Sequence, residues 1–484
     1  MAAVRWWDGG DPGATRRPIP TPPSGREEPG PPRAATGDPG GDLGDLGDLG
    51  DLGDLGDLGD LGRCLGSEDL LGSLLGGEDA LTGERAIPEA DARTQVDAVA
   101  DLVAEERELA FGTRPEPTFL TAGALAERVR ADLDASYPSE DADLDAALLA
   151  ALGAVAPGTD LRATVADLLG GQVVGFYDPD TGELVVGADD PSEPLDPVEL
   201  VTLAHELDHA LTDEHLGLPV DDDAFVGGPD AHAAGLALVE GDATLIAQRF
   251  SLVAIPFEEQ LAMLVDPSLR EQQAGLEEFP HLLAQELTFP YLEGLSFVCS
   301  LHAEGGWEAV DAAYTRPPTT TAQILFPERY LAAEAAVDPP DPGALPGPWD
   351  RSRTTTFGAA PLLWLFEAPG DDPGAALDRP RERAAAWAGG EVVQWSDGPH
   401  RAVGLSLVER DGASPPLCDS VQQWYRAAFP DAATDGSLDG GDGPGDGVVL
   451  RADGERQDAV LRCTDGDVRL GIGPDLVTAE SLAR

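Results

Sequence analysis

Two histidines four residues apart, in a segment with strong helix signals, constrain this chain more than any other feature. The segment contains His205-Glu206-Leu-Asp-His209. Residues four apart on a helix project from one face about one turn from each other, so both imidazoles suit one Zn²⁺ as nitrogen ligands. Glu206 then lies beside the ion, where its carboxylate can act on a metal-bound water. The pattern predicts a site for a single zinc ion on this helix.

The ends of the helix can also be read from the sequence. Asp196 is a good N-cap, Pro197 suits the first helical position, and Glu199 stands three residues after the cap. Gly217 is a typical residue just beyond a helix end. We therefore expect the helix to begin after Asp196 and to end near Leu216.

A third zinc ligand has competing candidates downstream. His215 follows the first histidine by ten residues, which is the metzincin spacing, but that motif has Gly where this chain has Thr212. If the helix continues through Thr212, His215 points away from the metal. Glu240 lies in a second predicted helix, 230–253. Small residues flank it and allow close helix approach: Ala233, Ala237, Ala243, Thr244 and Ala247. We expect Glu240 to be the third ligand, with His215 as the alternative and His232 as a weaker one.

Composition argues against a nucleic acid partner and against a transmembrane segment. The 484 residues carry a formal net charge of −60, with 30 basic against 90 acidic side chains. We therefore expect no nucleic acid partner, because the large excess of acidic side chains would repel its phosphates. No run of about 18 apolar residues occurs, so the sequence predicts no transmembrane segment.

The cysteines and the N-terminus bear on the compartment. Cys418 and Cys463 both fall in the C-terminal part, where a disulfide between them would imply an oxidising compartment; the sequence leaves this pairing open. The first ten residues lack the apolar core of a signal peptide. Read literally, the N-terminus predicts a cytoplasmic protein, and an extracytoplasmic one if the true start lies elsewhere.

The residue pattern divides the chain into four parts and predicts an α+β fold that is mainly α. Residues 1–90 form a low-complexity acidic tail with seven Gly-Asp-Leu repeats, a composition typical of disorder. Residues 91–335 are a helical catalytic domain with a short β-hairpin at 172–186. Residues 336–350 are a Pro-rich linker, and 351–484 are a small α+β domain.

Periodicity and turn signals predict the individual elements. Helices are expected at 94–108, 122–133, 144–155, 161–169, 257–265, 282–303, 307–314 and 418–429. Strands are expected at 391–395, 402–408, 448–451, 459–463 and 468–472. The hairpin before the zinc helix has two readings: an edge strand that pairs with extended substrate, or a small structural hairpin.

The motif and its surroundings resemble a group of uncharacterised bacterial gluzincin-like zinc metallopeptidases. The resemblance is carried by His205-Glu-Leu-Asp-His209-Ala-Leu, Ala237-Leu-Val-Glu240-Gly-Asp242-Ala, Gly175-Phe-Tyr-Asp-Pro and Gln323-Ile-Leu-Phe-Pro-Glu-Arg-Tyr330. It spans about Thr94 to Leu331 and is looser beyond. It implies a zincin fold, a peptide or protein substrate, zinc on His205, His209 and Glu240, and Glu206 as general base.

This chain departs from that pattern at two positions. Thermolysin-like gluzincins have Asp four residues after the third ligand, where this chain has Thr244; we expect Asp213, one turn beyond His209, to orient a ligand instead. Asp208 is charged at a position that is usually uncharged, and it either faces water or orients a ligand. Hydrolysis also needs a donor to the oxyanion. The candidates for that donor are Tyr291, Tyr177 and His281.

The predicted activity is hydrolysis of peptide bonds by a zinc-activated water, with Glu206 as the base. The alternative is a non-catalytic binding or scaffold protein that keeps a zincin fold. Glu206 argues against the alternative, since a site that only binds metal does not need this carboxylate.

Overall fold

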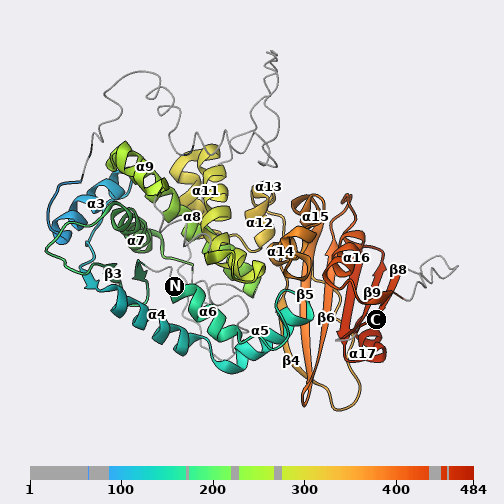
Figure 1. Cartoon of the computed structure of the whole chain (residues 1–484). Helices are drawn as coiled ribbons and strands as arrows, with labels where there is room; N and C mark the ends of the chain where they lie inside the picture. Colours follow the sequence, from blue (N-terminus) through green and yellow to red (C-terminus); the bar gives the residue numbers. More distant parts are fainter. Residues whose placement is uncertain are drawn as a thin grey trace, which may run out of the picture.

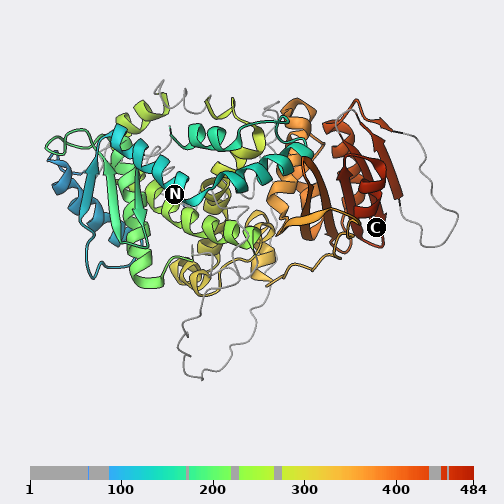
Figure 2. The same ribbon diagram turned by 90° about the horizontal axis from the view of Figure 1, so that it is seen from below.

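The computed structural model describes Cys64, Arg85 and residues 87–170, 174–219, 228–265, 275–434, 448–454 and 457–484. The predicted disordered tail, 1–90, lies outside the described residues apart from Cys64, Arg85 and 87–90. The described chain is mixed α+β and mainly helical, as the sequence predicts. A three-stranded sheet and a seven-stranded sheet lie at opposite ends of the molecule, with helices between them (Figures 1 and 2).

Most helices of the predicted catalytic domain, 91–335, match the predicted ranges within about three residues, and α5 begins five residues before its predicted start at 144. These helices are α3 (Ala92–Glu106), α4 (Ala122–Ser136), α5 (Ser139–Ala151), α6 (Leu161–Gly170), α7 (Pro197–Leu216), α8 (Pro229–Ala254), α9 (Phe257–Val265) and α11 (His281–Thr315). Two short helices follow, α12 (Thr321–Leu325) and α13 (Pro327–Leu331). The helices predicted at 282–303 and 307–314 are the two segments of α11, which breaks at Gly305 and Gly306.

Helix α7 has the ends that its sequence predicts. The Asp196 side chain accepts from the backbone N–H of Glu199 at 2.9 Å, and the Glu199 side chain accepts from the backbone N–H of Asp196 at 2.8 Å. This reciprocal capping box satisfies two donors that the helix itself leaves unpaired. The helix is followed by Gly217 at a positive φ of 74°, a conformation that glycine adopts without strain.

Helix α8 is the central helix of residues 91–335 and is buried along nearly its whole length. It packs against α7 on one side and α11 on another. At the second contact the backbones nearly touch, because a Cβ built on Gly241 would lie 2.2 Å from the carbonyl carbon of Gly294. Of the small residues predicted to admit a close neighbour, Ala237 lies at this contact, since a Cβ built on Gly294 would lie 2.1 Å from the carbonyl oxygen of Ala237. The close neighbour is α11, whereas the prediction concerned the helix that carries the histidines.

The small sheet has the order β1-β3-β2 and lies against α7. Strands β2 (Gly175–Asp178) and β3 (Glu183–Gly187) are the predicted hairpin. Strand β1 (Pro117–Leu120), which the sequence analysis missed, pairs with β3 in parallel. It is four residues long and its partner lies more than sixty residues away, so no local pattern announces it. Consequently β2 is an edge strand.

The C-terminal sheet contains the predicted strands and two more. Its order is β4 (Asp350–Thr356), β5 (Trp387–Asp397), β6 (His400–Glu409), β10 (Asp467–Gly473), β9 (Asp458–Thr464), β8 (Val448–Asp453) and β7 (Ala433–Thr434), all antiparallel. The helices are α14 (Ala359–Glu367), α15 (Pro380–Ala384), α16 (Leu417–Ala428) and α17 (Leu476–Leu482), with 3₁₀ turns at Pro369–Asp371 and Pro373–Ala375. Neighbouring residues point to opposite faces of the sheet, so Val392 joins the main core while Val393 packs with Leu482 of α17.

The boundary between residues 91–335 and the C-terminal domain, 351–484, is closely packed. One hydrophobic cluster extends from the helices of residues 91–335 into the inner face of the C-terminal sheet. Leu345, within the predicted Pro-rich linker, is buried against Trp395. Asp145 of α5 accepts a 2.7 Å hydrogen bond from Tyr137 and forms an ion pair with Arg353 of β4. These contacts fix the linker and α5 against the sheet.

All four cysteines are bonded in pairs. Cys418–Cys463 is the pairing that the sequence left open. Cys64–Cys299, which the sequence analysis did not anticipate, ties a residue of the predicted tail to α11. Cys64 is buried, and its carbonyl accepts from the Arg249 guanidinium at 2.8 and 3.1 Å. Paired cysteines are typical of proteins that mature in oxidising compartments, which favours the extracytoplasmic reading.

Candidate metal centre

The ligand-type side chains of His205, His209 and Glu240 converge between α7 and α8. Glu240 Oε2 lies 3.0 Å from Nε2 of His205 and 3.3 Å from Nε2 of His209. The two histidine Nε2 atoms are 3.0 Å apart. Atoms bound tetrahedrally to zinc at about 2.0–2.1 Å lie roughly 3.3 Å from one another, close to these separations. The three residues fit one metal ion.

The charges of the histidines and Glu240 favour one another and outweigh the effect of burial. Burial lowers the pKa of His205, but the hydrogen bond and charge of Glu240 outweigh it, so that pKa is raised overall. Burial raises the pKa of Glu240, and the two histidines outweigh this effect, so that it falls well below its ordinary value. Glu240 is therefore ionised, and its negative charge lies where a divalent cation would be bound.

Glu206 lies beside this group without belonging to it. Its Oε2 accepts a 2.7 Å hydrogen bond from the backbone N–H of Tyr177 in β2. That N–H is directed at α7 instead of at β3, since β2 is the edge strand. The side chain is largely buried, with 9% of the residue surface exposed. The expected base is thus held between the metal ligands and the edge strand β2.

Of the three expected oxyanion donors, the structure brings Tyr291 to the site. Its ring on α11 lies 5.9 Å from the ring of His205, centroid to centroid. The charge of Glu240, then burial and the charge of Glu206, raises the pKa of Tyr291 well above its ordinary value, so the phenol keeps its proton. The Tyr177 hydroxyl instead donates to Asp213 at 2.9 Å. His281 lies 3.2 Å from Glu367, in another part of the molecule, and is not at the site.

The other candidates from the sequence lie outside the metal group. His215 is exposed near the end of α7, where its Nε2 is 2.9 Å from the carbonyl of Ala110. The helix does continue through Thr212, as the argument against His215 required. His232 is buried on α8 but is not among the converging ligands. Asp213 accepts from Tyr177 and, at 3.3 Å, from the backbone N–H of Leu218, at the end of α7.

Asp208 does not face water, which removes one of the two readings given for it. The residue is fully buried, and its Oδ2 accepts a long, 3.4 Å hydrogen bond from Thr212. Burial and the nearby charge of Asp242 raise the pKa of Asp208 well above its ordinary value, and the charge of Arg107 offsets only part of this rise. No sequence pattern indicated Arg107. The only signal for it was the charge of Asp208, since a buried carboxylate requires a counter-charge.

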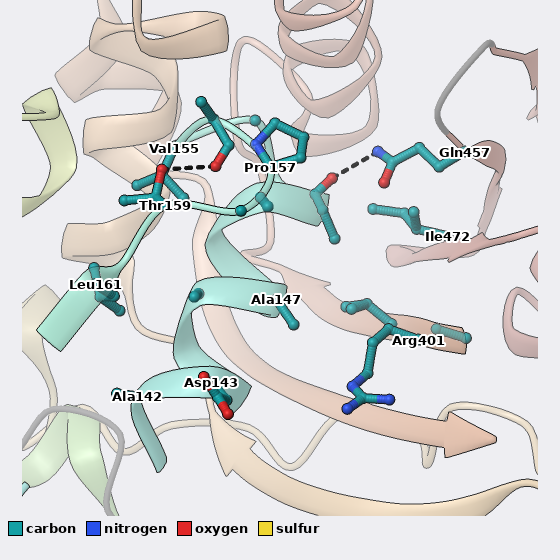
Figure 3. A pocket seen from close by; sticks show the side chains of 18 of the residues that line it. Ala142, Asp143, Ala147, Val155, Pro157, Thr159, Leu161, Arg401, Gln457 and Ile472 are labelled. Carbon is teal, nitrogen blue, oxygen red and sulfur yellow. Dashed lines mark hydrogen bonds between the residues drawn. The ribbon is translucent and has the colours of Figure 1, made fainter. Parts of the chain in front are cut away.

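A separate cavity of about 1510 Å³ lies between α5 and the C-terminal sheet. Figure 3 shows Ala142, Asp143 and Ala147 on one side of it, and Arg401 and Gln457 on the other. None of the metal-centre residues lines this cavity. It is therefore distinct from the site on α7 and α8.

Among the described residues, none of the helices combines the length and the apolar composition needed to cross a membrane. Comparisons with protein-family models, with curated proteins and with solved structures find no match to this chain.

Proposed function

We propose that this chain is a zinc-dependent metallopeptidase of gluzincin type. The observation that carries the proposal is the convergence of His205, His209 and Glu240, with the carboxylate of Glu206 beside them. Structural zinc sites are usually closed by four protein ligands, whereas catalytic sites use three and leave one position open. Two histidines and one glutamate form a set of the catalytic type.

The residues around the ligands supply the remaining chemistry. Bound zinc would lower the pKa of a water molecule and polarise the substrate carbonyl. Glu206 takes a proton from the attacking water and passes it to the leaving amine. The hydrogen bond from Tyr177 fixes one of its oxygens and leaves the other for this proton. Tyr291 keeps its proton and donates to the developing oxyanion.

The edge strand supports a peptide as the substrate. Strand β2 has β3 on one side only, and α7 with Glu206 lies near its other side. An extended peptide adds to such an edge through main-chain hydrogen bonds, which recognise backbone independently of sequence. Substrate bound in this way would lie next to Glu206. The small sheet, the metal helix α7 and the ligand helix α8 are consistent with a zincin fold, which we include in the proposal.

The test uses Glu206→Gln, which removes the base and keeps the shape of the side chain. We expect the purified wild type to contain about one zinc per chain and to cleave unfolded protein substrates. Glu206→Gln should retain the zinc and lose cleavage, because the substituted amide cannot take a proton. A matched control is Glu193→Gln, at an exposed position just before α7, which should retain both.

Zinc content by elemental analysis and fragment release by mass spectrometry distinguish the outcomes. Cleavage that survives in Glu206→Gln contradicts the mechanism. A wild-type protein that holds zinc and cleaves nothing favours the binding or scaffold alternative.

A further inference from the structure

A buried charged cluster lies behind the metal centre, where α3, α7, α8 and α11 meet. Its cation is Arg107, which follows the last turn of α3 and is fully buried. The guanidinium donates to Asp242 of α8 from Nε at 3.3 Å and from Nη2 at 3.1 Å. Nη2 also donates to Asp311 of α11 at 2.6 Å, and the Tyr314 hydroxyl donates to Asp242 at 2.9 Å. We call Arg107, Asp208, Asp242, Asp311 and Tyr314 the Arg107 cluster.

Two carboxylates of this cluster belong to the helices that carry the metal ligands. Asp208 directly precedes His209, and Asp242 follows Glu240 by two residues. Two residues correspond to about 200° around a helix, so Asp242 lies on the side of α8 opposite to Glu240. A contact that fixes Asp242 therefore fixes the rotation of α8 about its axis, and with it the direction of Glu240.

The geometry of Arg107 suits this task. A guanidinium is planar, and its donors point in fixed directions, unlike the single rotatable ammonium of lysine. Its position is further restricted by Trp307, whose ring centroid lies 4.3 Å from the guanidinium carbon. Asp242 is fully buried and forms an ion pair with Arg107 at 3.1 Å. Without this counter-charge, the buried carboxylate of Asp242 would cost several kcal/mol.

We propose that Arg107 is a positioning residue of the metal centre, which fixes the rotation of α8 through Asp242 and so directs Glu240 at the two histidines. The proposal rests on the proposed zinc function and deepens it. It also accounts for one departure of this chain from the gluzincin pattern. At position 244, where thermolysin-like gluzincins have Asp, this chain has Thr. The carboxylate of Asp242 acts on the site indirectly instead, because it fixes α8 through Arg107.

The test separates metal affinity from stability. The first variant is Arg107→Lys, which keeps the charge and loses the planar contacts. The second is the triple variant Arg107→Met, Asp208→Asn and Asp242→Asn, which removes the cation and both carboxylates together and avoids an uncompensated buried charge. The control is Arg249→Met, which removes a second arginine near the Trp307 ring that binds the Cys64 carbonyl.

Zn²⁺ affinity is measured by competition with a chelator, and folding of the metal-free proteins by circular dichroism and thermal melting. Co²⁺ in place of zinc reports the ligand geometry through its visible absorption. We expect Arg107→Lys and the triple variant to bind Zn²⁺ about tenfold or more weakly, as is usual when groups that orient metal ligands are lost. Their Co²⁺ spectra should change, whereas Arg249→Met should melt at a lower temperature and keep both the affinity and the spectrum.

The proposal is overturned if the folded triple variant, or folded Arg107→Lys, binds Zn²⁺ with wild-type affinity and an unchanged Co²⁺ spectrum. That result would leave the zinc function standing. A wild-type protein that binds no Zn²⁺ would instead refute the metal centre itself, and the role of Arg107 with it.

Discussion

The backbone N–H of Tyr177 in β2 donates a 2.7 Å hydrogen bond to Oε2 of Glu206 in α7. This contact joins the strand edge that suits an extended peptide to the carboxylate expected to act as the base. It is made by the main chain, so it does not depend on the tyrosine side chain. That side chain faces Asp213 instead.

Tyr177→Phe should therefore leave the metal centre intact. The substitution removes the 2.9 Å hydrogen bond to Asp213 and should lower the free energy of unfolding by about 0.5–1.5 kcal/mol. Zinc content should not change, and Asp213→Asn should behave in the same way. The check is urea unfolding together with elemental analysis. A marked loss of zinc affinity in Asp213→Asn would show that Asp213 orients a ligand, as the sequence alone suggested.

Glu240→Ala should lose zinc, because it removes one of three converging ligands. His215→Ala is the matched comparison, since it removes the competing candidate near the end of α7. It should retain zinc at the wild-type level and lose only the contact with the Ala110 carbonyl. Metal content of the purified variants decides between them, and zinc lost from His215→Ala would restore the metzincin-type alternative.

Gly241→Ala should destabilise the protein by about 1–3 kcal/mol, because the added Cβ has no room between α8 and α11. The clash is with the backbone of Gly294, which cannot rotate away as a side chain can. Gly123→Ala in α4 serves as the control, because a Cβ there meets nothing within 4 Å. It should stabilise the helix by about 0.5–1 kcal/mol. Urea unfolding of the metal-free proteins measures both, and equal effects would contradict the close approach.

Asp230 should make stability fall as the pH rises. Burial raises its pKa to about 6, although hydrogen bonds from Thr321 lower it. An unfolded aspartate has a pKa of about 3.9, so the folded state binds the proton more tightly. Below about pH 4 the ionisation of Asp230 does not affect the free energy of unfolding. Above about pH 4 it lowers this free energy progressively, by up to roughly 2–3 kcal/mol.

Asp230→Asn removes this effect and keeps an oxygen for Thr321. We expect the variant to be more stable than the wild type near pH 8, by up to about 2 kcal/mol, and equally stable near pH 4. Asp143→Asn, at an exposed position of α5, should leave the pH dependence as it is in the wild type. Urea unfolding at the two pH values is the measurement. A difference between Asp230→Asn and wild type that is independent of pH would refute the assignment.

The sequence by itself determined the features that depend on neighbours within a few residues. The cap at Asp196, the end at Gly217 and the shared face of His205 and His209 follow from local backbone geometry, and the structure has all three. Glu240 was selected because its neighbours are small, a local signal of close helix packing. The strands at 391–395 and 402–408 were found for the same reason, since alternation and turns are local.

Only the tertiary structure decided which distant groups meet. Strand β1 pairs with β3, Cys64 with Cys299, and Arg107 at the end of α3 with Asp242 of α8, across separations of 67, 235 and 135 residues. No periodicity specifies such pairs, because contacts between distant segments follow from how whole elements pack. The choice of Tyr291 over His281 has the same cause: both lie on α11, and only the packing of α11 on α8 shows which one faces Glu240.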